Sequence, residues 1–312
     1  MKIVFMGTPQ AAVPSLERIL SDGHEVVAVY TQPDRPSGRG QRIVYSPVKQ
    51  YAIEHGLAVF QPTKIKTEEA LQSFKSHNAE VAVVVAYGRI LPESFLTAYP
   101  HGAINVHFSL LPKYRGAAPV NWAIVNGEDT TGVTTMQMDA GLDTGAILMQ
   151  KATDIGTDET SVELMLRLSQ LGAELLSETL AKLDELVAQP QEDAFATFAP
   201  IMKREDGLID WRMSASEIAK RIRGFQPFPT TFTRYRDARV TVWQARCEDV
   251  PPTHEAGQII EAKGDSLVVA CGSGTALRVI ELQPEGKRRM TTRDFLNGCP
   301  IAVGDRFGTF AK

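Results

Sequence analysis

Cysteine is scarce in this chain, which has only three, and Cys247, Cys271 and Cys299 stand far apart. An odd number at this spacing fits neither a disulfide framework nor a zinc site, and it is typical of a reducing compartment. Long apolar runs are missing too, because none approaches the roughly 20 residues that span a bilayer. The opening "MKIVFMGTP" begins a strand-like run and has no apolar signal region. We therefore expect a cytoplasmic protein without a membrane partner.

A strong charge of either sign is also absent. The 312 residues carry a net charge of −4, which by itself speaks against a nucleic-acid-binding protein. The charge is unevenly distributed, however. Residues 206–312 contain 16 Lys and Arg against 13 Asp and Glu, whereas the first 205 residues contain 17 against 24. A mildly basic C-terminal part after an acidic N-terminal part indicates two domains with different tasks.

Familiar cofactor and nucleophile motifs are missing as well. The turn "FMGTP" has neither the glycine spacing of a dinucleotide fingerprint nor the Lys-Ser/Thr of a phosphate-binding loop. We therefore expect no NAD and interpret the turn as a plain strand-to-helix connection. No serine stands in a nucleophile-elbow sequence, which speaks against serine-hydrolase chemistry. No metal site is expected.

The first half of the chain alternates two kinds of segment. Apolar runs at 2–7, 25–31, 80–88 and 102–108 predict strands that are buried on both faces. Segments with helical spacing lie between them, at 10–21, 47–55 and 67–76. This alternation predicts a doubly wound, mostly parallel, Rossmann-like α/β sheet, with its binding site beyond the carboxyl ends of the strands. A helix at 120–127, strands at 131–139 and 146–155, and a helix from 160 to about 187 would follow.

The second half of the chain has a different pattern. A polar stretch interrupted by prolines follows the long helix and predicts a linker. After a helical segment at 214–225, short strand-like runs separated by turn residues begin at Thr231, and they predict a small β-barrel or sandwich. We expect three parts: a catalytic domain at 1–186, a linker at 187–205 and a C-terminal domain at 206–312.

Two polar residues end the fourth apolar strand. Asn105 and His107 are two positions apart and therefore point to the same face. Another strand is followed by "MDAGLDTG", whose glycines imply a tight loop that can hold Asp143 in place. Each residue alone has an ordinary structural explanation, as a buried histidine or a turn aspartate. Brought together, the two strand ends would place an amide, an imidazole and a carboxylate around one crevice.

This trio suits acyl transfer to an amine. Attack on a formyl or acyl carbon creates an oxyanion that a protonated histidine and an amide N–H can stabilise. A carboxylate can hold the imidazolium and direct the proton that the attacking amine releases. Because the amine can attack directly, no serine or cysteine nucleophile is needed.

The motif "NVHFSLLPKYRGAAPVNWAI", followed by "MDAGLDTG", resembles the signature of the formyltransferases that use 10-formyltetrahydrofolate. Within this family the chain is most similar to the branch that formylates methionyl initiator tRNA. The similarity extends over essentially the full length, through "FMGTP", "TQPDRPSGRGQR", "SPVK", "VVVAYGRILP", "IDW" and "QPEGKRRM". The resemblance implies an OB-like fold for the C-terminal barrel and a catalytic triad of Asn105, His107 and Asp143.

The resemblance also implies binding residues. Those expected around the folate are Ala86, Tyr87, Gly88, Arg89, Ile90, Ser109, Leu110, Leu111, Pro112, Met138 and Asp139. "PDRPSGRGQR", at 33–42, is in itself a flexible basic loop in which Pro and Gly prevent regular structure. In the family such a loop grips the acceptor arm of initiator tRNA, with Arg39 matching its key arginine. The residues expected to bind tRNA are Arg35, Arg39, Arg42, Lys287, Arg288 and Arg289.

Two other functions stay open at this point. Formyltransferases that act on a small amine, such as an amino-sugar nucleotide or glycinamide ribonucleotide, share the triad; the basic loop and the basic C-terminal domain favour tRNA. A non-catalytic RNA-binding protein with a degenerate enzyme domain is the second alternative, and the intact triad speaks against it. The family also implies a monomer.

Overall fold

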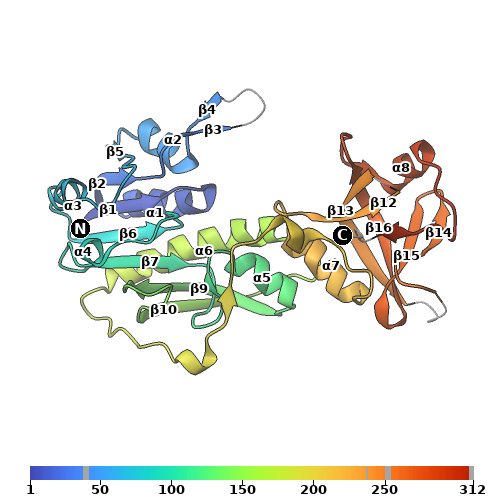
Figure 1. Ribbon diagram of the computed structural model, residues 1–312. Coiled ribbons are helices and arrows are strands. Elements are labelled where there is room, and N and C mark those ends of the chain that lie inside the picture. Colours follow the sequence, from blue (N-terminus) through green and yellow to red (C-terminus); the bar gives the residue numbers. More distant parts are fainter. Residues whose placement is uncertain (38–41, 237, 250–253, 309–312) are drawn as a thin grey trace. The chain divides into compact units, whose positions relative to one another are not determined.

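The computed structural model describes residues 1–37, 42–236, 238–249 and 254–308 (Figure 1). The chain separates into two compact units. The first contains residues 1–119, 130–154 and 165–199, and the second contains residues 120–129, 155–164 and 200 onward. Among the described residues, every helix is too short or too polar to cross a membrane.

The first unit is built on a seven-stranded sheet in the order β10-β9-β7-β6-β1-β2-β5. Five of its strands are parallel: β1 Lys2–Gly7, β2 Glu25–Tyr30, β5 Val59–Phe60, β6 Val81–Val85 and β7 Ala103–His107. The central strands β6 and β7 are buried along their whole length, as their continuous apolar sequences predict. Two further strands, β9 Thr130–Gln137 and β10 Ile147–Asp154, complete the sheet.

Helices connect and cover these strands. They are η1 Gln10–Ala12, α1 Val13–Ser21, α2 Pro47–Glu54, α3 Glu68–Lys75, α4 Glu93–Leu96 and α6 Ser161–Ala181. Side chains cap three of them: Ser46 accepts a hydrogen bond from Lys49 N, Thr67 accepts one from Ala70 N, and Thr160 accepts one from Glu163 N. Gly172 lets α6 approach the sheet closely, since a Cβ there would lie 3.0 Å from Val106. α6 ends at Ala181, earlier than predicted, and continues as turns.

The direction of one strand in the sheet differs from the sequence-based prediction. β9 runs antiparallel to β7, with Gln137 opposite Ile104 and Thr134 opposite His107. The motif that carries Asp143 therefore leaves β9 beside the beginning of β7, not beside its carboxyl end. The loop between β9 and β10 must return Asp143 to His107. The two strand ends do not meet as they would in a wholly parallel sheet.

The basic loop at 33–42 is more regular than expected. β3 Arg35–Ser37 pairs with β4 Arg42–Val44 in an antiparallel ribbon, and Pro36 lies opposite Ile43. The expectation that Pro and Gly would prevent regular structure was wrong for the two ends of this segment. A two-stranded ribbon consists only of edge strands, and an edge strand tolerates a proline.

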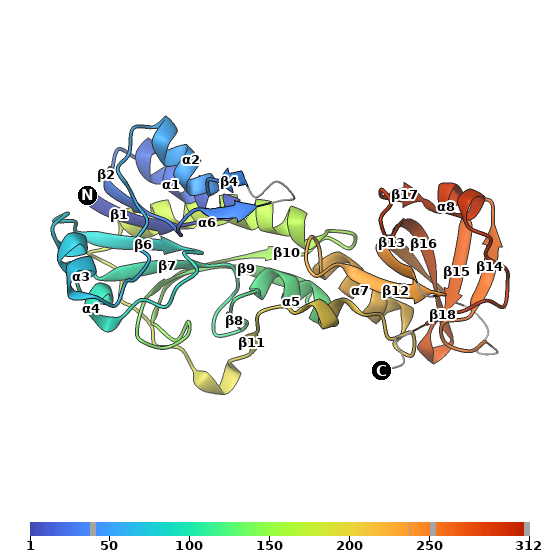
Figure 2. The same cartoon turned by 45° about the horizontal axis from the view of Figure 1, so that its top comes forward.

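Residues 187–199 belong to the first unit and are attached to the rest of it at several points. Gln189 pairs with Ile147, and β11 Phe198–Ala199 pairs with β8 Arg115–Gly116 (Figure 2). η2 Asp193–Phe195 lies between these two attachments. The predicted linker bounds of 187–205 stay a prediction, but the first part of this stretch is hydrogen-bonded to the unit that carries His107 and Asp143.

The second unit is an antiparallel barrel. Its sheet has the order β14-β15-β16-β13-β12-β18, and hydrogen bonds of Ile259 N to Asp305 O and of Phe307 N to Gly257 O link its two edges. The predicted fold, a mostly parallel α/β sheet followed by a β-barrel domain, is confirmed. The strands are β12 Thr231–Tyr235, β13 Ala238–Asp249, β14 Ile259–Lys263, β15 Ser266–Ala270, β16 Thr275–Pro284, β17 Met290–Thr291 and β18 Phe307–Gly308.

Helices complete this unit: α5 Pro119–Asn126, η3 Arg204–Gly207, α7 Ala215–Gly224, η4 Gly272–Gly274 and α8 Thr292–Gly298. Ser214 and Glu217 form a capping box at the start of α7. The barrel core includes Trp211, Val240 and Leu267, all nearly inaccessible to solvent. Asn121 of α5 donates hydrogen bonds to the carbonyls of Gly224 and Gln226, so this helix packs with the C-terminal unit.

Candidate active site

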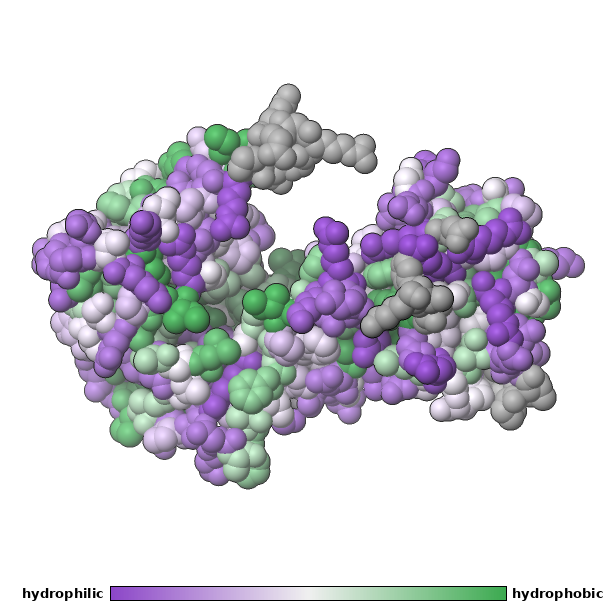
Figure 3. Space-filling model, viewed as in Figure 1, coloured by the Kyte–Doolittle hydropathy of each residue, from purple (hydrophilic) through white to green (hydrophobic). Residues whose placement is uncertain are grey.

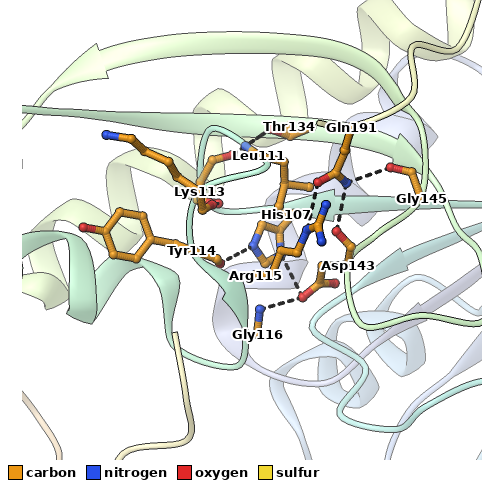
Figure 4. Close-up of polar contacts among 11 residues, drawn as sticks. His107, Leu111, Lys113, Tyr114, Arg115, Gly116, Thr134, Asp143, Gly145 and Gln191 are labelled. Atoms are coloured by element: carbon orange, nitrogen blue, oxygen red, sulfur yellow. Dashed lines mark hydrogen bonds and ion pairs between the residues drawn. The ribbon is translucent and has the colours of Figure 1, made fainter. Parts of the chain in front are cut away.

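Asn105 and His107 are buried near the end of β7, with 8 % and 6 % of their surfaces exposed. The Nε2 of His107 lies 2.9 Å from the carbonyl oxygen of Tyr114 (Figure 4). Because a carbonyl oxygen can only accept, Nε2 must carry the hydrogen of this bond. The other ring nitrogen, Nδ1, then faces the carboxylate of Asp143, with Oδ2 at 3.8 Å.

Asp143 is held in an unusual backbone conformation. Its φ angle is +53°, in the left-handed region that non-glycine residues rarely adopt. Oδ2 accepts a hydrogen bond of 2.8 Å from Gly116 N–H, which turns the carboxylate toward the imidazole. A strained residue kept in place by specific contacts is common at functional sites. The structure therefore brings His107 and Asp143 together, as the sequence predicted.

The amide of Asn105 is available for a ligand. Within the described part of the chain it makes no side-chain hydrogen bond, although most buried polar groups have a partner. Asn105 and His107 also share one face of β7. An amide and an imidazole therefore lie side by side near Asp143.

The segment after His107 is anchored by other strands. Thr134 Oγ1 accepts from Leu111 N and donates to Ser109 O, and Gln150 donates to Leu111 O. Ser109 itself is fully buried and its hydroxyl donates to Lys113 O. Of the four predicted folate residues here, Leu110 and Pro112 are partly exposed, whereas Ser109 and Leu111 are buried. Their contact with folate stays a prediction.

The loop after β6 is fixed by the turn "FMGTP". Thr8 and Gln32 donate hydrogen bonds of 3.1 and 3.0 Å to the carbonyl of Tyr87, and Arg89 donates to Gln32. The turn was interpreted as a plain connection, and the structure gives it this supporting role. Ala86, Gly88 and Ile90 are exposed, so backbone is accessible at this strand end. The buried Tyr87 hydroxyl has no hydrogen-bond partner among the described residues, and burial raises its pKa.

The β9–β10 loop is organised internally. Asp139 Oδ1 accepts from Gly141 N and from Thr144 Oγ1, at 3.1 and 2.7 Å. Its carboxylate thus shapes the loop that carries Asp143. Met138 is half-buried and its N–H donates to Ala103 O. Binding of folate by Met138 and Asp139 stays a prediction.

Two contacting residues were not found from the sequence. Gln191 donates to the carbonyls of Asp143 and Gly145, and Arg115 donates to Gln191. Arg115 lies inside the quoted signature, but a single arginine before a glycine carries no evident role. Gln191 stands in the polar stretch that was interpreted as a linker, so no local signal indicates it.

The predicted tRNA-binding residues lie in two places. Arg35 is exposed on β3, Arg42 lies on β4, and Arg39 falls outside the described residues. Lys287, Arg288 and Arg289 are exposed in the turn before β17. Arg289 pairs with Glu281 and lies over the ring of Trp243, 5.1 Å from its centroid, so it is already engaged within the barrel. The face of the C-terminal unit seen in Figure 3 is mainly hydrophilic.

The base of the β3–β4 ribbon is tied to the sheet by a lysine that is mostly buried. Lys49 Nζ lies 2.5 Å from Asp34 Oδ2 and 2.8 Å from Gln61 Oε1, and it also lies over the ring of Tyr45. Hydrogen bonds from Lys49 and Gln61 lower the pKa of Asp34 below its ordinary value. Elsewhere in the described ranges, no group of three or more His, Cys, Asp and Glu is arranged to hold a metal ion.

Comparisons with known proteins agree with this architecture. Residues 1–180 match the family described as formyl transferase, and residues 201–300 match the formyl transferase C-terminal domain. Relatives named methionyl-tRNA formyltransferase include one from Koribacter versatilis, 50 % identical over the full length of both chains. Another, from Geobacter metallireducens, is 46 % identical over 99 % of each chain.

Among solved structures, an N-formyltransferase from Helicobacter canadensis in complex with folinic acid and dTDP-3-aminofucose has the same fold. Its TM-score is 0.65 at 19 % identity, over 89 % of this chain and 98 % of that one. At this identity the likeness concerns the fold alone. The two family matches and the full-length relatives show more: this chain belongs to the formyl transferase family.

Proposed function

We propose that this protein transfers the formyl group of 10-formyltetrahydrofolate to the α-amino group of methionyl initiator tRNA. The observation that carries the proposal is identity of 46–50 % over nearly the whole length to proteins named methionyl-tRNA formyltransferase. The geometry of Asn105, His107 and Asp143 supports it. The product, N-formylmethionyl-tRNA, serves translation initiation.

The residues present fit a folate. The exposed backbone at Ala86 and Gly88 offers hydrogen-bonding groups to the edge of a flat, polar ring. The unpartnered amide of Asn105 lies near, on the neighbouring strand β7. Leu110 and Pro112 add partly exposed apolar surface after the same strand. The bound folate supplies an activated formyl group on a nitrogen.

The triad would act on this group as follows. The amine forms a bond to the formyl carbon, the bond from that carbon to the folate nitrogen breaks, and the amine proton ends on that nitrogen. Asn105 would donate to the formyl oxygen, and His107, protonated at Nδ1, would stabilise the negative charge that develops there. Asp143 would orient the imidazole and help to remove the amine proton.

The acceptor of the formyl group is inferred from segments of the chain other than those that carry the proposed triad. A small amine would need neither the basic ribbon at 35–44 nor an additional barrel with exposed basic residues. Arginines on an extended ribbon suit phosphates and unpaired bases. Arg35 and Arg42 of the ribbon, Arg39 between them in the sequence, and Lys287 and Arg288 on the barrel are therefore proposed as tRNA contacts. The ion pair with Glu281 makes Arg289 a weaker candidate.

One assay tests the acceptor and the donor together. The purified protein is given 10-formyltetrahydrofolate with charged initiator tRNA, charged elongator tRNA, free methionine or a dTDP-amino sugar. We expect rapid formylation of the initiator tRNA only. Formylation of the sugar would favour the small-amine alternative, and no turnover of any acceptor would favour a non-catalytic RNA-binding protein.

Two variants separate the chemistry from tRNA binding. His107→Ala should lower kcat strongly on every acceptor. Arg39→Ala should raise KM for tRNA and leave folate binding unchanged, because Arg39 belongs to neither the proposed triad nor the predicted folate set. We further propose that the protein acts in the cytoplasm and that it is a monomer. Size-exclusion chromatography with light scattering can check the oligomeric state.

A further inference from the structure

We infer that Gln191, held by Arg115, is a positioning residue for Asp143, and that the segment after α6 is thereby part of the active site. This inference rests on the proposed function for its kinetic test, although the geometry is independent of it. No residue of the predicted triad or folate set comes from this segment. Its contribution is visible only in the fold.

The first observation is the double hydrogen bond of Gln191. Its Nε2 donates to the carbonyl of Asp143 at 2.8 Å and to that of Gly145 at 2.7 Å (Figure 4). Both hydrogens of one amide are therefore used to hold the backbone on either side of Thr144. This is the part of the loop in which Asp143 adopts its φ of +53°. A conformation of this kind needs such external contacts to persist.

The second observation is that Arg115 fixes the orientation of this amide. Arg115 Nε–H can only donate, and it lies 3.0 Å from Gln191 Oε1. The oxygen of Gln191 must therefore face Arg115, and the NH₂ group must face the two carbonyls. Arg115 itself is almost completely buried, and its Nη2 is paired with the exposed carboxylate of Asp193.

The third observation is that the same segments contact the other end of Asp143. Gly116, which follows Arg115, donates its N–H to Asp143 Oδ2 at 2.8 Å. Gly116 has a φ of +123°, and a Cβ there would lie 2.6 Å from Ala199 O. The absence of a side chain thus allows β8 and β11 to pair. Pairing of β8 with β11 brings residues 187–199 alongside the site.

Together these contacts connect the pairing of β11 to the position of Asp143. β11 pairs with β8, which places Arg115; Arg115 orients Gln191; Gln191 fixes the backbone of Asp143. Gly116 fixes the Asp143 carboxylate, and the carboxylate faces His107 Nδ1 at 3.8 Å. A shift of about 1 Å in a catalytic group can lower the rate on the order of 100-fold, so loss of Gln191 should lower kcat.

The decisive experiment is a double-mutant cycle of Gln191 and Asp143. Gln191→Leu should lower kcat by about 10- to 100-fold and leave KM for 10-formyltetrahydrofolate within about threefold. Asp143→Ala should lower kcat further. In the double variant, Gln191→Leu should add almost nothing to the effect of Asp143→Ala. Additive losses, or an unchanged kcat in Gln191→Leu, would overturn the inference.

A second variant guards against misfolding. Gln191→Glu has the same size and keeps the acceptor for Arg115, but it loses both donors to the loop. It should lower kcat as Gln191→Leu does, and wild-type kcat in this variant would contradict the proposed role. Glu192→Gln, the exposed neighbour on the same segment, is the matched control.

A measurement without turnover separates this inference from the proposed function. The ring ¹⁵N chemical shifts of His107 report which groups face its two nitrogens. In Gln191→Leu they should move in the same direction as in Asp143→Ala, whereas Glu192→Gln should leave them unchanged. Unmoved shifts would overturn the inference even with a protein that is inactive on tRNA. An inactive wild-type protein with the expected shifts would contradict only the proposed function.

Discussion

Asp143 lies with its Oδ2 3.8 Å from Nδ1 of His107, although the strand before Asp143 runs antiparallel to the strand that carries His107. The opposite nitrogen of the ring donates to Tyr114 O, so the imidazole is held between two acceptors. The carboxylate thus faces the nitrogen that is not committed to the backbone. Asp143 should therefore orient the imidazole that the proposed mechanism uses.

Asp143→Asn tests this relationship with little change of shape. The amide oxygen can still accept from Gly116 N–H, but the negative charge facing His107 is lost. We expect kcat to fall by about 10²- to 10⁴-fold, the range typical of a lost proton-transfer group, with folate binding retained. Single-turnover kinetics and folate titration measure the two effects. Asp184→Asn, at a carboxylate that is 88 % exposed, is the control. A decrease of less than about fivefold would be incompatible with the proposed role of Asp143.

A second prediction concerns the base of the β3–β4 ribbon. Lys49 donates to both Asp34 and Gln61 and is mostly buried. Lys49→Met removes the charge but keeps much of the volume, and it leaves Asp34 without its main partner. The free energy of unfolding at pH 7 should fall by about 1–3 kcal/mol.

The pH dependence of this effect has a definite sign. The hydrogen bond from Lys49, followed by that from Gln61, lowers the pKa of Asp34 in the folded protein. The pair therefore stabilises the fold fully above the ordinary pKa of 3.8. This stabilisation is lost as the pH falls through the lowered value. Urea unfolding at pH 7 and near pH 3 should show a smaller difference between wild type and Lys49→Met at the lower pH. An equal difference would contradict this account.

The sequence correctly predicted those structural features that depend on residues close to one another along the chain. The strands at 2–7, 25–30 and 103–107 are buried on both faces, and an apolar run contains that information directly. The helices predicted at 47–55, 67–76 and 214–225 are present as α2, α3 and α7, because helical spacing of apolar residues is likewise a local pattern. Asn105 and His107 were placed on one face because side chains on a strand alternate.

The relationships that were missed are long-range. The direction of β9 depends on its pairing with β7, and an apolar run does not record direction. The contact of Gln191 with Asp143 spans 48 positions and uses a segment without periodicity. α8 was not predicted either, because seven residues are too few to show a helical period, although Thr291 caps them. The sequence singled out His107 and Asp143, which lie close together, but not the residues that hold Asp143 in place.

Cysteine reactivity gives a third prediction. Cys271 is buried in the barrel, and burial raises the pKa of its thiol to about 12. Because the thiolate is the reactive form, Cys271 should resist alkylation at pH 8. Cys247 is exposed and should react first. Iodoacetamide labelling followed by peptide mass spectrometry gives the order. Labelling of Cys271 as fast as that of Cys247 in the folded protein would contradict the described packing.

The last prediction concerns the barrel core. Trp211 is 3 % exposed, its Nε1–H donates to Thr233 Oγ1 at 3.0 Å, and its ring stacks on Phe307 with centroids 5.8 Å apart. Trp211→Ala should destabilise the C-terminal unit by about 3–5 kcal/mol, because it leaves a large cavity and removes the N–H that donates to Thr233 Oγ1. Arg212→Ala, next in sequence and 85 % exposed in its side chain, should have little effect, because an exposed ion pair contributes little to stability.

Tryptophan fluorescence can follow this unit selectively. The chain has three tryptophans, and Trp122, Trp211 and Trp243 all belong to the second unit. In Trp211→Ala, the two that remain still report its unfolding in urea. The midpoint of the fluorescence transition should fall strongly in Trp211→Ala and hardly in Arg212→Ala. Equal midpoints in the two variants would mean that Trp211 does not organise the barrel core, because burial of the indole is the main difference between the two sites.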